Sequence, residues 1–436
     1  MSEPLIPFEK AVRYASVSDV GMRRKNNQDS KNILVSSDEE FWKKRGHLFV
    51  VADGMGAHAA GELASKLAAD SIPHVYSKDL EKDPITALHH AVTTANTTIY
   101  QRGQAESEFA GMGTTCSTLL LLPEGAVIAH VGDSRIYRLR NGQLEQLTFD
   151  HSLVWEMEAA GKLSGSDTDL HFPKNIITRS LGPSPKVQID IEGPFSISSG
   201  DIFLLCSDGL SGQVSDHEMG AILGSLPPAE AAQLLVDLAN LRGGPDNITV
   251  VIAQVDHPPV AQSDNRSIEE SHPKSRLNII LLSVLILIAA ACFILERMQL
   301  LENLYLTTIA GIGATVTAIV MLLQHFEKSA TEKVPATAPQ PLGRGPYRTY
   351  ACNPTQETVE NFSGISAELR KSLEEIGTEV DWQKFDEHVR KADLSARKSD
   401  FADSIYHHCR GISFLVAALK SNKESLLASD SQIDLI

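Results

Sequence analysis

Two long uncharged apolar stretches place the strongest limit on how this chain can fold. Leu277–Leu295 spans 19 residues and Leu304–Leu323 spans 20 residues, and neither contains a charged side chain. At a rise of about 1.5 Å per residue, each helix would cross a hydrocarbon layer of about 30 Å. The alternative is a pair of buried core helices, but helices that are apolar on every side rarely fit a water-soluble domain. We therefore predict a transmembrane hairpin over residues 277–323.

Basic residues flank the predicted hairpin on its outer sides. Lys274 and Arg276 precede it, Lys328 and Lys333 follow it, and Arg297 is the only basic residue in the connecting loop. Because the cytoplasmic flanks of membrane helices carry the excess of Lys and Arg, this pattern places both termini in the cytoplasm.

The predicted hairpin divides the chain into a long N-terminal region and a shorter tail. Pro-rich and polar runs on either side of the hairpin predict extended, unpacked linkers. The tail has apolar residues at helical spacing, which predicts a small helical unit that packs on the N-terminal region, binds a partner, dimerises or stands alone. The expected domains are an N-terminal domain over 1–257, a linker over 258–276, the hairpin (277–295 and 304–323), a linker over 324–354 and the tail over 355–436.

Composition excludes several classes of protein. The formal net charge of −16 disfavours a broad nucleic-acid-binding surface. The five cysteines form no C-x-x-C pair and are odd in number, so neither a disulfide framework nor a thiolate zinc site is indicated. A reducing compartment is the simpler interpretation.

Short apolar runs in the N-terminal region cluster along the chain instead of alternating strictly with helical patterns. This arrangement predicts an α+β fold with antiparallel sheets and covering helices. The expected strands are Ser16–Val20, Leu48–Ala52, Thr118–Leu122, Ala126–Val131, Ile202–Cys206 and Ile248–Val255. The expected helices are Gly61–Val75, Asp83–Arg102, Leu153–Ala160, Asp216–Leu223 and Pro228–Leu241.

Acidic residues stand at the ends of these apolar runs. Asp53, Asp133 and Asp208 each follow an expected strand, and Asp246 precedes another. A single Asp-Gly pair is usually a plain turn, but four such acids in one domain would repel one another unless cations lay between them. Oxygen ligands suit Mg²⁺ or Mn²⁺, and the lack of Cys and His at matching spacings argues against zinc.

Seven short motifs follow one another along the N-terminal region. They are Ser18–Asp29, Val51–Gly56, Gly111–Thr115, Val131–Arg135, Thr178–Gly182, Ser207–Leu210 and Asp246–Thr249. In this order they resemble the motifs of the metal-dependent protein serine/threonine phosphatases of the type 2C (PPM) family, bacterial type. The resemblance covers about residues 12–256 and includes nothing after residue 257.

The resemblance implies a four-layer α/β/β/α sandwich and a metal site. Asp53 would bridge two Mg²⁺ or Mn²⁺ ions, and the Gly54 carbonyl would be a further ligand. Asp208 and Asp246 would hold the two ions from the opposite side. The donor atoms do not choose between Mg²⁺ and Mn²⁺, because both ions accept the same oxygen set.

Three more roles follow from the resemblance. Arg24 would grip the substrate phosphate as a catalytic residue, and Asp29 would lie beside the metals, mostly through bound water. Asp133 matches an acid that shares a weaker third ion with Asp208. Residues 151–181 fall where the family carries a variable flap beside the active site.

The implied function is hydrolysis of phosphoserine and phosphothreonine in proteins by a metal-activated water. The implied partners are phosphorylated proteins and a cognate Ser/Thr kinase pathway, and no nucleic acid. With the hairpin, the chain is expected in the inner (cytoplasmic) membrane, with the catalytic domain and tail in the cytoplasm. The alternative is a catalytically silent phosphatase fold that senses phosphoproteins and signals through the hairpin and tail, although the retained acids and Arg24 disfavour it.

Overall fold

A computed structural model describes residues 12–56, 59–162, 176–256 and 342–433, with side chains described up to residue 421. The predicted transmembrane hairpin over 277–323 and the linker over 258–276 lie outside these residues. Among the helices that the structure does describe, none is long and apolar enough to cross a membrane.

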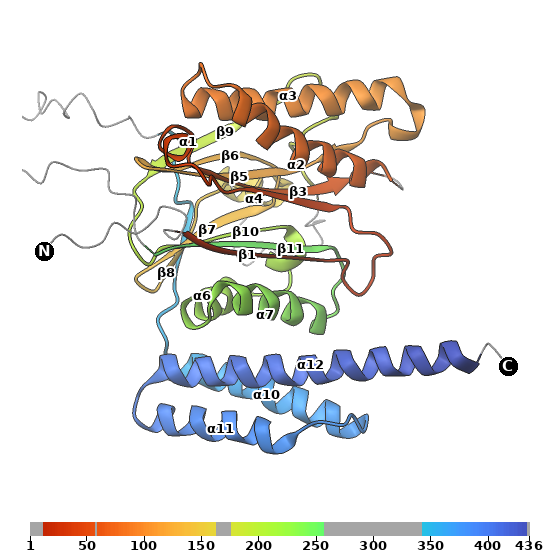
Figure 1. Cartoon of the computed structure of the whole chain (residues 1–436), viewed down its shortest axis with the longest axis vertical. Helices are drawn as coiled ribbons and strands as arrows, with labels where there is room; N and C mark the ends of the chain where they lie inside the picture. The colour runs from red at the N-terminus through yellow and green to blue at the C-terminus, as the bar shows by residue number, and fades with distance from the viewer. Residues whose placement is uncertain (1–11, 57–58, 163–175, 257–341, 434–436) are drawn as a thin grey trace, which may run out of the picture. The chain divides into compact units, whose positions relative to one another are not determined.

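Two antiparallel sheets form the centre of the molecule (Figure 1). The first, sheet A, has the strand order β1-β11-β10-β7-β8-β12. Its strands are β1 (Val12–Asp19), β7 (Arg135–Arg140), β8 (Gln143–Gln146), β10 (Ile202–Cys206), β11 (Ile248–Val255) and β12 (Arg348–Ala351).

The second sheet, sheet B, has the strand order β2-β3-β5-β6-β9, and the short strand β4 pairs with the end of β3. Its strands are β2 (Asp29–Leu34), β3 (His47–Met55), β4 (Gly113–Thr114), β5 (Cys116–Leu122), β6 (Gly125–Val131) and β9 (Asp190–Phe195). Every residue of β5 and β6 is buried, which explains why these strands are apolar along both faces.

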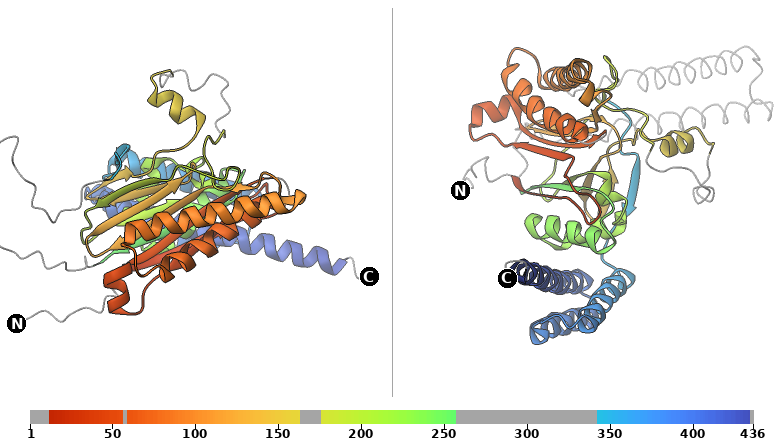
Figure 2. Two further views of the ribbon diagram at one scale, coloured as in Figure 1. Left: turned by 90° about the horizontal axis from the view of Figure 1, so that it is seen from above. Right: turned by 90° about the vertical axis from the view of Figure 1, so that its right-hand side faces the viewer.

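Helices cover the outer face of each sheet, so the domain has four layers (Figures 1 and 2). Helices α2 and α3 enclose one core with sheet B, the two sheets enclose a second core, and α6 and α7 enclose a third with sheet A. The predicted α/β/β/α sandwich is therefore confirmed. The helices before residue 257 are α1 (Glu39–Arg45), α2 (Ala60–Lys78), α3 (Pro84–Ala105), α4 (Leu153–Ala159), α5 (Asp208–Ser211), α6 (Asp216–Ser225) and α7 (Pro228–Leu241), with a 3₁₀ turn at Ser107–Phe109.

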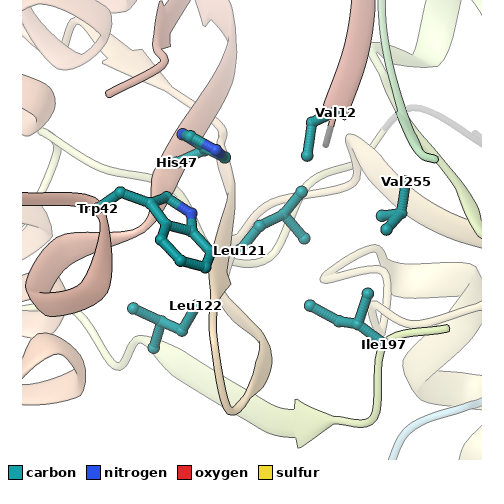
Figure 3. A pocket seen from close by; sticks show the side chains of 7 residues that line it. All are labelled: Val12, Trp42, His47, Leu121, Leu122, Ile197 and Val255. Atoms are coloured by element: carbon teal, nitrogen blue, oxygen red, sulfur yellow. The ribbon is translucent and has the colours of Figure 1, made fainter. Parts of the chain in front are cut away.

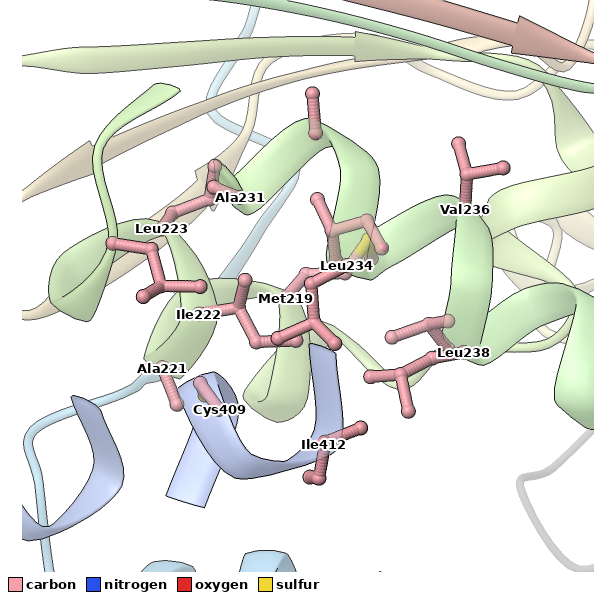
Figure 4. Close-up of a cluster of buried hydrophobic side chains, with 14 of the residues drawn as sticks. Met219, Ala221, Ile222, Leu223, Ala231, Leu234, Val236, Leu238, Cys409 and Ile412 are labelled. Atoms are coloured by element: carbon pink, nitrogen blue, oxygen red, sulfur yellow. The ribbon is translucent and has the colours of Figure 1, made fainter. Parts of the chain in front are cut away.

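Three helices occupy the tail, where helical spacing predicted a helical unit. They are α10 (Gln356–Glu375), α11 (Trp382–Arg397) and α12 (Phe401–Ile433). Figure 4 shows Cys409 and Ile412 of α12 against Met219 and Ile222 of α6, and all four side chains belong to one buried cluster. Of the arrangements left open by the sequence, the structure shows the tail packed on the N-terminal domain.

The last part of the expected linker over 324–354 differs from the sequence prediction. Residues 342–354, which we call the return segment, are packed and not merely extended. Arg348–Ala351 form β12 on the edge of sheet A through antiparallel pairing with β8, and Cys352 is buried against Gly220. The prediction was wrong here because a Pro-rich run gives no local sign of the partner strand, which lies about two hundred residues earlier in the chain.

Candidate metal centre

Strand pairing brings the first two predicted acids face to face. In the register of β2 with β3, Asp29 lies opposite Asp53. The backbone of Asp53 is held by Thr115, whose hydroxyl accepts from the Asp53 N–H at 2.9 Å, and by Thr114, whose hydroxyl donates to the Asp53 carbonyl at 2.9 Å. The predicted acid at the tip of this strand is therefore fixed by β2, by β4 and by the link between β4 and β5.

Sheet A supplies two further acids at the same end of the sandwich. Asp208 begins α5 directly after β10, and Asp246 lies in the turn before β11. The Ser207 hydroxyl links the two sheets, because it donates to Asp29 Oδ2 at 2.7 Å and accepts from the Thr249 N–H at 2.9 Å. Asp29 and Asp208 thus have adjoining positions although they come from different sheets.

Asp133 lies in the turn between β6 and β7 and is 8% exposed. The next side chain, Ser134, hydrogen-bonds through its hydroxyl to Thr115 Oγ1 at 2.8 Å. Through Thr115 the turn that carries Asp133 is joined to the end of β3 that carries Asp53. We call the end of the sandwich where these five aspartates lie the acid end.

Burial and mutual repulsion raise the pKa values at the acid end. Burial is the main cause in each case, and nearby carboxylates add to it. The pKa of Asp29 rises to about 7 with contributions from Asp208 and Asp246, and that of Asp133 rises to about 7 with a contribution from Asp208. The pKa values of Asp53 and Asp208 also lie above their ordinary range. Such a cluster of perturbed carboxylates is typical of a functional site.

Several carboxylate oxygens at the acid end have no hydrogen-bond partner. In the described part of the chain, these buried atoms are Oδ1 of Asp29, Oδ1 of Asp133 and Oδ1 of Asp208. An oxygen-only set of this kind fits a hard divalent cation such as Mg²⁺ or Mn²⁺. Within the same described residues, no three His, Cys, Asp or Glu side chains converge closely enough to define a metal site by geometry alone. The unpaired oxygens therefore carry the argument for metal binding.

Arg24 lies at the acid end, but it pairs with one of the predicted ligands. Its Nη2 donates to Asp246 Oδ2 at 2.7 Å, and its side chain is 47% exposed. The other Asp246 oxygen, Oδ1, accepts from the Asn247 N–H at 2.8 Å. A planar guanidinium with this exposure is able to turn toward a phosphate group and bind it through two hydrogen bonds.

Gly54 has no room for a side chain. A Cβ atom on Gly54 would lie 2.1 Å from the Gly61 carbonyl oxygen and 2.6 Å from that of Gln28. The Gly54 N–H donates to the Gln28 carbonyl at 3.0 Å. This close approach holds the start of α2 and the loop before Asp29 against the strand that carries Asp53.

Asn247 organises the loop of Arg24, and its role was not predicted from the sequence. Its side-chain oxygen accepts from the Gln28 N–H at 2.8 Å, and its amide nitrogen donates to the carbonyls of Val20 and Asn26. Ser207 and Thr115 have similar supporting roles. The only sequence feature that could have indicated these three residues is their position inside the motifs. Hydrogen bonds between segments so far apart in the chain leave no local sequence pattern.

A small apolar pocket lies at the opposite end of the strands, which we call the far end (Figure 3). Its volume is about 10 Å³. Val12 begins β1, His47 begins β3 and Val255 ends β11, so these lining residues are separated from the acids by the length of the strands. The pocket has no carboxylate in its lining and is too small for a phosphorylated side chain.

Comparisons with known proteins identify the family to which this chain belongs. A family model described as "Protein phosphatase 2C" matches residues 23–231. Protein phosphatase PhpP of Streptococcus pneumoniae is 38% identical over 244 residues, which are 55% of this chain and 96% of PhpP. Serine/threonine phosphatase stp of Listeria monocytogenes is 38% identical over 245 residues, which are 55% of this chain and 94% of that protein.

A solved structure of a serine/threonine phosphatase is also similar to this chain. The Mycobacterium tuberculosis serine/threonine phosphatase PstP/Ppp aligns with a TM-score of 0.50 and 36% identity, over 56% of this chain and 99% of that one. The chain belongs to the protein phosphatase 2C family. It is a metal-dependent phosphoprotein phosphatase of the Ser/Thr type.

Proposed function

We propose that this phosphatase is anchored in the membrane and hydrolyses phosphoserine and phosphothreonine in proteins at a binuclear Mg²⁺ or Mn²⁺ centre. The observation that carries the metal centre is the group of unpaired buried oxygens at Asp29, Asp133 and Asp208. Buried carboxylates are costly unless they are paired or coordinate metals, so this group calls for cations.

The ligands would be divided between the two sheets. Asp53 would bridge both ions with the Gly54 carbonyl beside it, and Asp208 and Asp246 would hold the ions from sheet A. Asp29, fixed by the Ser207 hydroxyl, would bind mainly through water. Asp133 would share a weaker third ion with Asp208.

The chain's own residues supply binding and orientation for the reaction. When bound, the ions would activate a water and offset the negative charge of the phosphate. Arg24 would leave Asp246 and hold two phosphate oxygens, in a position fixed by the hydrogen bonds of Asn247 to its loop. This cationic contact is most valuable as charge redistributes on the phosphoryl group in the transition state.

Phosphatase activity is tested with the full-length chain, para-nitrophenyl phosphate and Mn²⁺. We expect turnover in the parent and its loss in Asp208→Asn, with Mn²⁺ binding followed by calorimetry. A parent that binds Mn²⁺ without turnover would instead support the silent sensor. Activity that survives in Asp208→Asn would contradict the proposed ligand set.

Membrane anchoring rests on the sequence of residues 277–323. The two apolar stretches would span the membrane, and their basic flanks would keep the catalytic domain and tail in the cytoplasm, where proteins modified by a Ser/Thr kinase are found. In cell fractionation with an alkaline carbonate wash, we expect the full-length chain in the membrane pellet and a variant without residues 277–323 in the supernatant. Release of the full-length chain by carbonate would contradict the anchor.

A further inference from the structure

The return segment crosses the edge of the sandwich from one sheet to the other. Leu342 exchanges backbone hydrogen bonds with Gly193 of β9, the edge strand of sheet B. A few residues later, Arg348–Ala351 pair with β8 of sheet A. Figure 1 shows this light blue segment running along the side of both sheets. The C-terminal part of the chain is thereby joined to both sheets of the catalytic domain.

A buried carboxylate anchors the return segment just before β12. Glu192 is 3% exposed, and its Oε2 accepts from the Arg344 N–H at 2.9 Å and the Gly345 N–H at 3.0 Å. The Tyr347 hydroxyl donates to the other Glu192 oxygen. These bonds hold the segment immediately before Arg348.

Arg348 reaches from β12 to helix α4. Its Cζ atom lies 3.9 Å from the centroid of the Trp155 ring, and its Nη2 lies 2.6 Å from Glu158 Oε2. One guanidinium therefore makes a cation–π contact and an ion pair with the same helix. Phe149 packs edge-on against Trp155, with ring centroids 5.3 Å apart, and also contacts Tyr347.

The chain on either side of α4 is attached to the acid end. Before the helix, the His151 N–H donates to the Gly132 carbonyl at 2.7 Å, next to Asp133. After it, the Thr178 N–H donates to the His151 carbonyl at 2.8 Å, and Leu181 pairs with Thr114 beside Gly54. Figure 2 shows the yellow α4 standing out from the sandwich, so its position depends on contacts such as those of Arg348.

We propose that Arg348 is a positioning residue that fixes α4 beside the active site, and that the C-terminal part of the chain thereby sets the affinity for phosphoprotein substrates. The inference rests on the proposed phosphatase site. Arg24 and the acids all lie outside α4, so a small phosphate ester needs only those groups. A phosphorylated protein is far larger than its phosphate and contacts the surface around the site, to which α4 belongs.

Kinetics with two substrates separate positioning from a general loss of structure. In the full-length chain, we expect Arg348→Ala to raise KM for phosphorylated casein about threefold to fivefold, as the loss of a cation–π contact and an exposed ion pair would do. The kcat and KM for para-nitrophenyl phosphate should stay unchanged. Arg348→Lys keeps the ion pair without the planar stacking and should lie between the parent and Arg348→Ala.

Thr349→Ala is the matched control, because Thr349 is the next residue of β12 and is exposed. It should behave as the parent with both substrates. Equal KM values for casein in Arg348→Ala and Thr349→Ala would overturn the proposal, and so would a parallel loss with both substrates. A parent that is inactive on both substrates with Mn²⁺ bound would instead contradict the underlying phosphatase function.

Fluorescence reports on α4 directly. In a Trp42→Phe, Trp382→Phe background, Trp155 is the only tryptophan left of the three. It is 8% exposed, so acrylamide should quench it weakly in the parent background and about twice as strongly after Arg348→Ala exposes the ring face. Unchanged quenching in Arg348→Ala would show that Arg348 does not hold α4.

Discussion

Buried carboxylates at the acid end of the sandwich have unpaired oxygens, whereas a buried carboxylate at the far end is fully paired. Asp29 and Asp133 each have an oxygen without a partner among the described residues, and both pKa values rise to about 7, mainly through burial. Asp201, before the start of β10, is 1% exposed, and its two oxygens accept from Arg140 Nε and Nη2 and from the Ser198 N–H.

The difference teaches how to tell a functional acid from a structural one. An unpaired buried carboxylate destabilises the fold, so its presence needs a reason other than stability. A paired one is explained by the hydrogen bonds that it accepts. If this distinction is correct, the same Asp→Asn substitution should affect activity at one end and stability at the other.

The largest effect is expected from Asp53→Asn at the acid end. It would remove the bridging ligand, and because metal ions supply several kcal/mol of transition-state stabilisation, kcat should fall by about a thousandfold. Without metal the thermal midpoint should not fall, since Asp53 is repelled by its neighbouring aspartates. Steady-state kinetics and thermal melts with and without Mn²⁺ measure both quantities. A retained kcat, or a lower midpoint without metal, would remove the distinction between the ends.

A pH effect is expected at the far end. His47 begins β3, is 1% exposed, and accepts the Ser36 N–H on its Nδ1 at 3.1 Å. Burial lowers the pKa of His47 from 6.5 to about 4. Between those values the unfolded state binds a proton that the folded state does not, so the free energy of unfolding should fall as pH drops from 6.5 to 4. The full contribution is about 3 kcal/mol.

Urea unfolding of the parent and of His47→Gln at pH 7 and near pH 4.5 measures this contribution. The variant should lose less stability than the parent over that interval. Identical losses would show that His47 is not the sensitive group. The raised pKa of Asp133 acts in the opposite direction. As pH rises toward 7, the folded state keeps a proton on Asp133 that the unfolded state has released, so the free energy of unfolding falls.

Asp201→Asn is the matched control for Asp53→Asn. It removes the charge that Arg140 and Ser198 contact, and we expect the free energy of unfolding to fall by about 2 kcal/mol. The kcat should be unchanged, because the far end is separated from the acids by the length of the strands. A fall in kcat without loss of stability would contradict the comparison.

Much of the sandwich and the position of the acids could be predicted from the sequence. Strands β5, β6, β10 and β11 and helices α2, α3, α6 and α7 have strong local patterns, because burial on one or both faces selects apolar residues. The acids at the strand tips could be found for the same reason, since each follows or precedes an apolar run. Their assignment as metal ligands stays a prediction.

Other elements could not be predicted because they depend on distant partners. Strand β2 begins at Asp29 and is largely polar, and β12 lies in a run with the composition of a linker. At the site, Ser207 contacts Asp29 from 178 positions away, and Asn247 holds Gln28 from 219 positions away. The spacing of apolar residues within a helix or strand does not indicate hydrogen bonds between segments so far apart. The same limit hid the contact of Arg348 with α4.

The smallest effect is expected from an exposed ion pair at the far end. Arg13 donates two hydrogen bonds to Asp256, but the two side chains are 54% and 24% exposed. Because water and salt screen this pair, Arg13→Ala should lower the free energy of unfolding by less than about 1 kcal/mol, and less still in about 0.5 M salt. Urea titrations at two salt concentrations measure the difference. A loss as large as that of Asp201→Asn would mean that pairing alone, and not burial, determines how much a carboxylate contributes at this end.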